Sequence, residues 1–177
     1  MSELTDRILI SNVRESRVAR FRRWAFIVVP LAAILFQVYL PLFFQFFGYL
    51  EMPLLVTIYF ALLRRDQVSG TFIGAGIGLV QDSLSHQPLG MFGIVKTMVG
   101  YFAASVGMRF DVDHSAMRFL LCLLFVCFHQ FFFWVLSSAL LGQQMGFDAQ
   151  QIFFVGLLNA AVGIFLFRFL DKLRERA

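Results

Sequence analysis

The sequence predicts an all-α integral membrane protein with six transmembrane helices. Of its 177 residues, 59% are hydrophobic and 15% are charged, which is more apolar surface than a water-soluble domain of this length can cover. The apolar residues form continuous runs instead of alternating with polar ones, and this pattern excludes a transmembrane β-barrel. At about 20 residues for each span, the length suffices for six spans joined by short loops.

The positions of Lys and Arg predict the orientation of these spans. Every Lys and Arg except Lys96 lies in the N-terminal arm, beside the loops after the second and fourth spans, or near the C-terminal end. Basic residues are retained on the cytoplasmic side, so we expect both termini in the cytoplasm and an even number of spans. The net charge of +4 is therefore a topology signal, and we expect no nucleic-acid partner.

The elements follow in order from this pattern. Residues 1–23 form a basic cytoplasmic arm, which either lies on the membrane surface as a weakly amphipathic helix or is solvated and orients the first span. The predicted transmembrane domain is 24–172, and a cytoplasmic tail follows at 173–177. Its spans are 24–47, 53–63, 69–84, 88–108, 115–141 and 151–170.

The third predicted span carries a stripe of small residues. Gly70, Gly74 and Gly78 stand four residues apart, and the next step of four reaches Asp82. On a helix, this spacing places the three glycines and the carboxylate on one face. Such a face lets two helix backbones approach closely. We expect it to pack against another span of this chain, with a second protein as the alternative.

Asp82 and Lys96 are predicted to lie within the membrane, where charged side chains are costly and usually paired. Lys96 stands about two turns into the fourth span, and its long side chain can reach toward the membrane surface. We therefore expect the two residues to form a pair or to share a water molecule. We interpret this pair as a polar lock that stabilises the fold, with a ligand or proton site as the alternative.

A second polar group is predicted near the middle of the membrane. Gln37 lies in the first span, His129 and Gln130 in the fifth, and Asn159 in the sixth. Buried amides and imidazoles need hydrogen-bond partners in hydrocarbon, so we expect these residues to bond between helices. No Cys, Asp or Glu stands at ligand spacing beside His129, so we expect no metal and no cofactor.

The sequence offers no sign of enzymatic chemistry. It has no glycine-rich phosphate loop, no serine nucleophile elbow and no paired acid and base, and its loops are too short for a soluble catalytic domain. Cys122 and Cys127 stand five residues apart in one apolar run and would face different directions on a helix. We expect buried thiols there and not a disulfide.

The stretch MPLLVTIYFALLRRDQVSGTFIGAGIGLVQDSLSHQPLG, at 52–90, resembles the MreD family of bacterial rod-shape-determining membrane proteins. The matching features are a short proline-led span with Tyr59, Phe60, Ala61 and Leu62, then Arg64 and Arg65, the glycine-rich span, Leu79 with Asp82, Leu89 with Gly90, Gln37 before Pro41, Asn159, and the basic tail. The resemblance covers about residues 24–172.

This resemblance implies a non-enzymatic scaffold in the inner membrane that acts in the cell-elongation complex. As a member of that family, the chain would bind the bitopic protein MreC and support lateral peptidoglycan synthesis and rod shape. It would also contact MreB, RodZ, RodA and its class B transpeptidase, directly or indirectly, and membrane lipid.

The family is also distantly similar to the substrate-binding subunits of energy-coupling-factor transporters, which are six-span helical proteins with an outward-facing pocket. This similarity leaves a second function open, a transporter-like subunit that binds a small molecule or lipid. In either function, the Gly70, Gly74 and Gly78 face would shape a cavity with Asp82 and Lys96. Those subunits carry an Ala-x-x-x-Ala motif in the first span, which this chain lacks.

Overall fold

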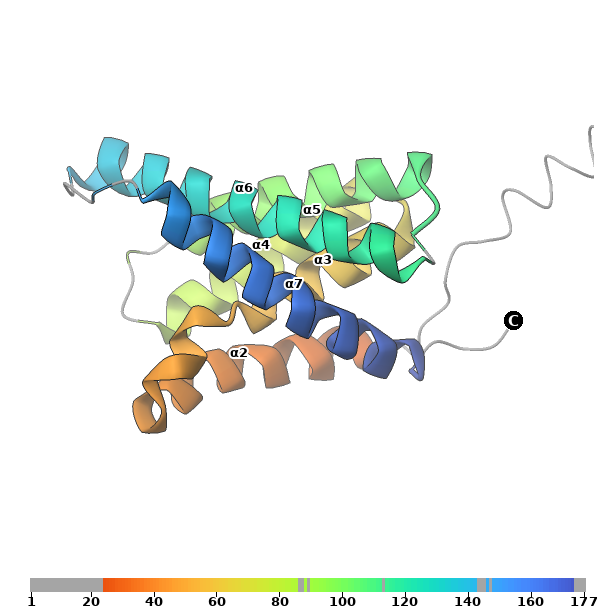
Figure 1. The fold of residues 1–177 in the computed structure, drawn as a ribbon, viewed down its shortest axis with the longest axis horizontal. Helices are drawn as coiled ribbons and strands as arrows, with labels where there is room; N and C mark the ends of the chain where they lie inside the picture. Colours follow the sequence, from red (N-terminus) through yellow and green to blue (C-terminus); the bar gives the residue numbers. More distant parts are fainter. Residues whose placement is uncertain are drawn as a thin grey trace, which may run out of the picture.

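The protein is described by a computed structural model, which covers residues 24–85, 88, 90–112, 114–142, 146 and 148–173. These residues form α-helices and one short 3-10 helix and contain no strand, so the predicted all-α class is confirmed (Figure 1). The elements are α2 (Ala25–Phe43), η1 (Gln45–Tyr49), α3 (Met52–Arg64), α4 (Gln67–Leu84), α5 (Met91–Arg109), α6 (Ser115–Leu141) and α7 (Ala149–Asp171). The predicted basic arm and the tail beyond residue 173 lie outside the described residues.

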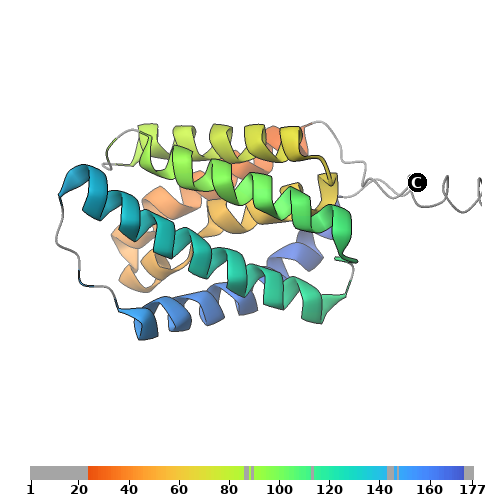
Figure 2. The ribbon, with the colours of Figure 1, turned by 90° about the horizontal axis from the view of Figure 1, so that it is seen from above.

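Five segments of the described chain are long and apolar enough to cross a membrane. They are α2, η1 together with α3, α5, α6 and α7. The predicted third span forms a helix, α4, but this helix is not among the five because amide, hydroxyl, carboxyl and glycine residues interrupt its apolar ones. It nevertheless runs beside α5 over most of its length (Figure 2).

The first span is shorter than predicted. We expected one helix over 24–47, but α2 ends at Phe43 and the backbone of Phe44 is extended. Pro41 lacks an N–H group and so removes one hydrogen bond from the last turn of the helix. The chain then turns through η1 and enters α3 at Met52.

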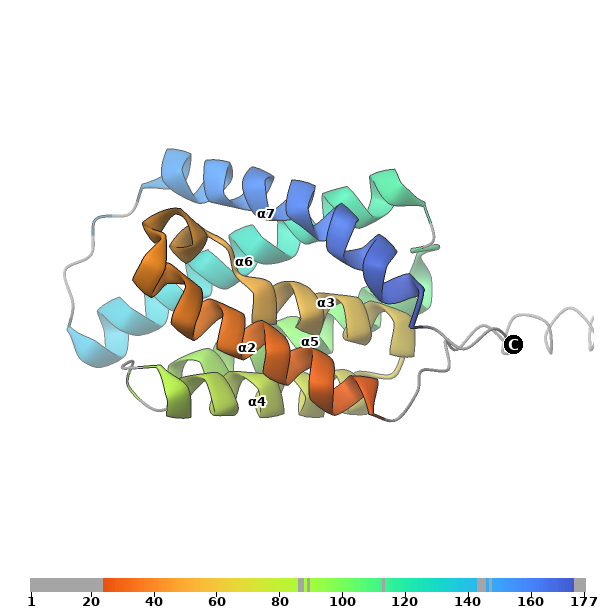
Figure 3. The same cartoon turned by 90° about the horizontal axis from the view of Figure 1, so that it is seen from below.

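The central element of the bundle is α3. All of residues 53–63 are buried, and α3 contacts each of the other α-helices described here (Figure 3). It ends at Arg64, and the left-handed backbone of the next residue, Arg65 (φ 54°), makes a tight turn into α4. Asp66 caps α4 by accepting a hydrogen bond from the Ser69 amide at 2.9 Å, and hydrogen bonding from Ser69 lowers the pKa of the Asp66 carboxyl.

The glycine stripe of α4 lies against the backbone of α5. A Cβ atom added at Gly70 would stand 2.5 Å from the carbonyl oxygen of Gly100, and one at Gly74 or Gly78 would also meet a backbone carbonyl of α5. Gly76, on another side of the same helix, has nothing within 4 Å of such an atom. The backbone of α5 therefore fills the space in which we expected a cavity.

The helices alternate in direction, so the bundle has two distinct ends. The start of α2 and the end of α7 lie at one end, with the turns after α3 and α5 (Figures 1 and 3). We call it the basic end because the described Arg residues beside these elements are Arg64, Arg65, Arg109, Arg118 and Arg168, with Lys172. The opposite end carries η1 and the connections from α4 to α5 and from α6 to α7.

Candidate functional site

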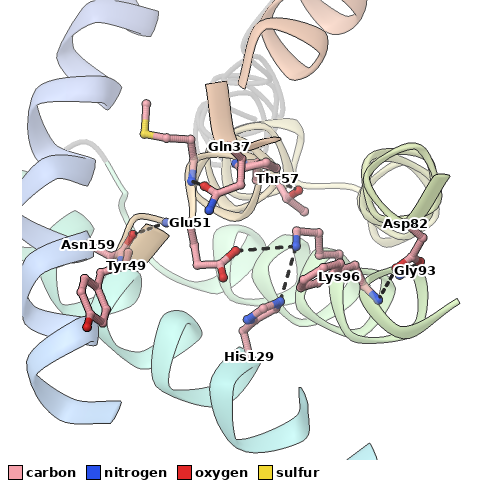
Figure 4. A network of polar contacts seen from close by, with 12 residues as sticks. Gln37, Tyr49, Glu51, Thr57, Asp82, Gly93, Lys96, His129 and Asn159 are labelled. Carbon is pink, nitrogen blue, oxygen red and sulfur yellow. Dashed lines mark hydrogen bonds and ion pairs between the residues drawn. The ribbon is translucent and has the colours of Figure 1, made fainter. Parts of the chain in front are cut away.

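Three ionisable side chains meet inside the bundle, from α5, from α6 and from the turn before α3 (Figure 4). The Nζ atom of Lys96 lies 4.0 Å from Oε2 of Glu51 and 3.5 Å from Nε2 of His129. Lys96 is fully buried and His129 is 1% exposed, whereas the Glu51 side chain retains 14% exposure. Ionisable groups enclosed within membrane helices commonly mark functional positions, so we treat this Glu51–Lys96–His129 cluster as the candidate site.

Aromatic rings cover the cluster on one side. The Lys96 ammonium lies 4.3 Å from the centroid of the Phe92 ring, a distance at which the ring face attracts a cation. Phe92 is in turn stacked against His129 and Phe133, with ring centroids 6.1 Å and 5.1 Å away. These rings separate the ammonium from the lipid and orient the imidazole.

Two amide side chains fix the turn that carries Glu51. Asn159 accepts a hydrogen bond from the Glu51 amide through Oδ1 and donates one to the carbonyl oxygen of Tyr49 through Nδ2, both at 2.8 Å. Gln37 accepts a hydrogen bond from the amide of Met52 at 3.2 Å. The first N–H groups of a helix have no partner within it, so these bonds satisfy the start of α3 inside the bundle.

The predicted mid-membrane group is thus divided by the structure. Gln37 and Asn159 hold one turn, and His129 contacts Lys96. Gln130 belongs to neither contact and lines a hollow toward the opposite end of the bundle. The hydrogen bonds of Gln37 and Asn159 go to backbone atoms and not to each other.

Asp82 lies on another side of α5 from the cluster (Figure 4). Its carboxylate accepts hydrogen bonds from the amides of Gly90, Phe92 and Gly93 at 2.9–3.0 Å. These donors belong to the first turn of α5, where an anion is favoured. The direct contact between Asp82 and Lys96 that we expected is therefore not found in the described chain: the start of α5 satisfies Asp82, and Lys96 extends toward Glu51 and His129.

Glu51 is the member of this candidate site that the sequence pattern does not single out. The signal was present, because Glu51 is the single acidic residue between residues 24 and 65. The sequence instead predicts a pair between Lys96 and Asp82, the acid nearest to it in the preceding span. The helix breaks after Phe43, and the chain therefore turns and places Glu51 inside the bundle. Hydropathy alone does not reveal that break.

Two polar atoms of the cluster are buried without a hydrogen-bond partner in the described chain, Oε2 of Glu51 and Nδ1 of His129. With Nε2 accepting from the ammonium, a neutral imidazole carries its proton on Nδ1. The cluster can therefore hold a charge pair and bind one further polar group. The described residues contain no group of three His, Cys, Asp or Glu side chains that could hold a metal ion.

A second polar contact joins three helices at the basic end. The Arg118 guanidinium, from α6, lies 2.6 Å from Oδ2 of Asp171 at the end of α7 and donates to the carbonyl oxygen of Val112 at 2.7 Å. Tyr59 of α3 donates to the same carboxylate at 2.9 Å. This contact fixes the ends of α6 and α7 relative to the central helix.

A family model described as the rod shape-determining protein MreD matches residues 19–176, a range that contains all the helices among the described residues. No curated protein and no solved structure matches the chain.

Proposed function

The chain belongs to the MreD family of rod shape-determining proteins, and we propose that it acts there as a non-enzymatic scaffold of the bacterial cell-elongation complex. In this role it binds MreC and supports lateral peptidoglycan synthesis. MreB, RodZ, RodA and its class B transpeptidase are further partners, in direct or indirect contact. The observation that carries the proposal is the family match over residues 19–176, which contain all the described helices.

The geometry supports a scaffold more than a transporter-like subunit. The cavity proposed for a ligand beside Gly74 is filled by the backbone of α5. Of the buried charged groups, Lys96 pairs with Glu51, and Asp82 accepts hydrogen bonds from backbone amides of α5. The similarity to energy-coupling-factor subunits stays a prediction, since no solved structure matches. A scaffold needs only stable helices with free outer faces.

We propose that the protein lies in the bacterial inner membrane with the basic end in the cytoplasm. We also propose that α4 crosses the membrane in addition to the five segments that qualify by length and composition, which gives six crossings. The arginines of the turns after α3 and α5 support this orientation. Val68 and Phe72 of α4 are 63% and 72% exposed, so this helix presents an apolar face to lipid although its other face is rich in glycine.

The contact with MreC is expected on the outer surface and not on the glycine face. Among the helices that qualify as spans, α2 is the least buried, so it has the largest share of apolar surface left for another span. A photo-crosslinking residue at Leu31 of α2 is therefore expected to capture MreC, with Phe72 of α4 and Phe165 of α7 as comparison positions, all three being exposed.

The proposal is tested by copurification of MreC with the tagged chain from membranes, before any crosslinking. We expect MreC to be retained by the wild-type chain. If MreC is absent although the chain is inserted and folded, the scaffold function with MreC is wrong. If MreC copurifies but is crosslinked from Phe72 or Phe165 and not from Leu31, the function stands and the assigned surface is wrong.

A further inference from the structure

A hollow of about 280 Å³ lies toward the opposite end of the bundle, between η1, the second half of α6 and the start of α7. We call it the α6–α7 hollow. Its aromatic lining consists of Tyr49, Phe133 and Trp134, and its polar lining of Gln130, Asp148 and Gln151. Binding pockets for small molecules combine apolar walls with a few polar groups in this way, and the volume is near the lower end of their usual range.

The walls of this hollow are fixed by contacts elsewhere in the bundle. Asn159 is fully buried and donates a hydrogen bond to the carbonyl oxygen of Tyr49, which holds Tyr49 in place. Phe133 is stacked on Phe92 at 5.1 Å. Asp148 caps α7 by accepting hydrogen bonds from the amides of Gln150 and Gln151 at 3.0 and 3.1 Å. The hollow is therefore preformed.

The polar groups define what the hollow can bind. The side-chain amides of Gln130 and Gln151 make no hydrogen bond with the described part of the chain, and each can both donate and accept. No Lys or Arg is present among the described lining residues, so no basic side chain of that set attracts a phosphate. The carboxylate of Asp148 already serves the N-terminus of α7. Uncharged hydroxyl groups match these amides, and the C–H face of a sugar ring matches the aromatic side chains.

A second, wider hollow of about 590 Å³ continues from the first along α7. The two share Tyr49, Asp148, Gln151 and Val155, and the second extends to Phe154 and Leu158. Its lining changes from polar at the start of α7 to apolar further along, and Phe154 is 58% exposed. A molecule with a polar head and an apolar chain follows the same gradient at a membrane surface.

We propose that the α6–α7 hollow binds the uncharged, hydroxyl-rich head group of a membrane amphiphile, a neutral glycolipid, whose hydrocarbon chain lies over Phe154 and Leu158. Gln130 and Gln151 bond the hydroxyl groups, and Trp134 and Phe133 cover the ring. This site is distinct from the contact with MreC and does not depend on it.

Trp134 provides the readout for this proposal. The chain has two tryptophans, and Trp24 lies at the basic end, so Trp24→Phe leaves Trp134 as the only one. The full chain with this change is placed in nanodiscs of phosphatidylethanolamine and phosphatidylglycerol, and glucosyl diacylglycerol is added in steps. We expect a saturable change in Trp134 emission, and no change with diacylglycerol that lacks the sugar.

Variants and a matched control connect the signal to the hollow. Gln130→Leu and Gln151→Leu each remove one amide and are expected to weaken the apparent affinity about tenfold. Gln45→Leu, at an exposed position of η1 that lines neither hollow, is expected to leave the affinity unchanged. Thermal unfolding of each variant shows whether the fold is retained, and Gln151 is exposed, so its replacement has little structural cost.

Three results would overturn the proposal. The first is the absence of a saturable response to glucosyl diacylglycerol in the folded chain. The second is an equal response to methyl glucoside at the same concentration, because the sugar ring alone would then be bound without the chain. The third is a response to tetramethylammonium and none to the glycolipid, which would make the aromatic residues and Asp148 a site for cations.

Discussion

Lys96 is a fully buried charged residue with several close partners. Its ammonium is fully buried and faces a carboxylate, an imidazole and an aromatic ring. The removal of two charges from water is costly, and their attraction offsets that cost only where both partners stay in place. The distance of 4.0 Å to Glu51 makes the two residues dependent on each other for stability.

Replacing Lys96 alone is therefore expected to be much more harmful than replacing both partners. Lys96→Met leaves the Glu51 carboxylate buried without its cation, and we expect a loss of about 3–5 kcal/mol in the free energy of unfolding. In the double variant Lys96→Met and Glu51→Gln, the loss is expected to be smaller than the sum of the two single losses. Thermal unfolding of the four proteins in detergent measures this coupling.

Ile94 provides the control for this cycle, because it lies on the same helix and is 47% exposed. Ile94→Met is expected to leave stability within about 0.5 kcal/mol of the parent. Strictly additive losses at Lys96 and Glu51 would show that the two charges do not interact and would contradict the pairing within the Glu51–Lys96–His129 cluster.

The sequence identified Lys96 and Asp82 as buried charges but assigned them to each other. The pairing depends on which side of α5 each group faces and on how deeply the turn before α3 enters the bundle. Neither quantity can be obtained from spacing along one helix. Asp82 was unusual in the sequence because of its place after the glycine stripe, yet its partners are backbone amides, which no residue pattern displays.

At the scale of the elements, the pairing of α4 with α5 rests on close contact between two backbones. Gly70 faces Gly100, and Gly78 faces the start of α5. The four-residue period predicted this stripe because small residues on one helix face are a local property of the sequence. Hydropathy does not reveal the break after Phe43, since phenylalanines stand on both sides of it, and Pro41 is a local signal that hydropathy does not weigh.

The stripe predicts different outcomes for two glycines of α4. Gly74→Leu drives a side chain into the carbonyl group of Lys96, so we expect a loss of about 1–3 kcal/mol or failure to assemble. Gly76→Leu faces open space and is expected to be neutral or slightly stabilising, because leucine favours a helix more than glycine does. Thermal unfolding and the yield of folded protein in detergent compare the two. Equal effects at both positions would contradict the close approach of α4 and α5.

At the scale of the whole molecule, the arrangement of charges about the bundle sets its orientation. The connections at the basic end carry arginines, while the described residues of the opposite end between α4 and α5 include none. The distribution of basic residues predicted this arrangement from the sequence because it depends on loop composition and on the number of spans, not on packing.

The orientation is tested with one cysteine at each end of α5. In a chain with Cys122→Ala and Cys127→Ala, Phe110→Cys lies after α5 and Pro88→Cys before it, both at exposed positions. A thiol reagent that cannot cross membranes is expected to label Pro88→Cys in spheroplasts and Phe110→Cys in inverted vesicles. The reverse labelling would place the basic end outside the cell. Labelling of both positions from one side would show that α5 does not cross.

The burial of α3 has a consequence for how the protein responds to its lipid. With 13 residues, α3 is about 20 Å long, shorter than the roughly 30 Å of hydrocarbon in a bilayer. A short helix that touched lipid would force the bilayer to thin around it. Because the other helices surround α3, lipid does not contact this short helix, and the bilayer does not have to thin around it. A thicker or thinner membrane therefore acts on α2, α6 and α7 by changing their tilt, and α3 keeps Glu51 at its depth beside Lys96.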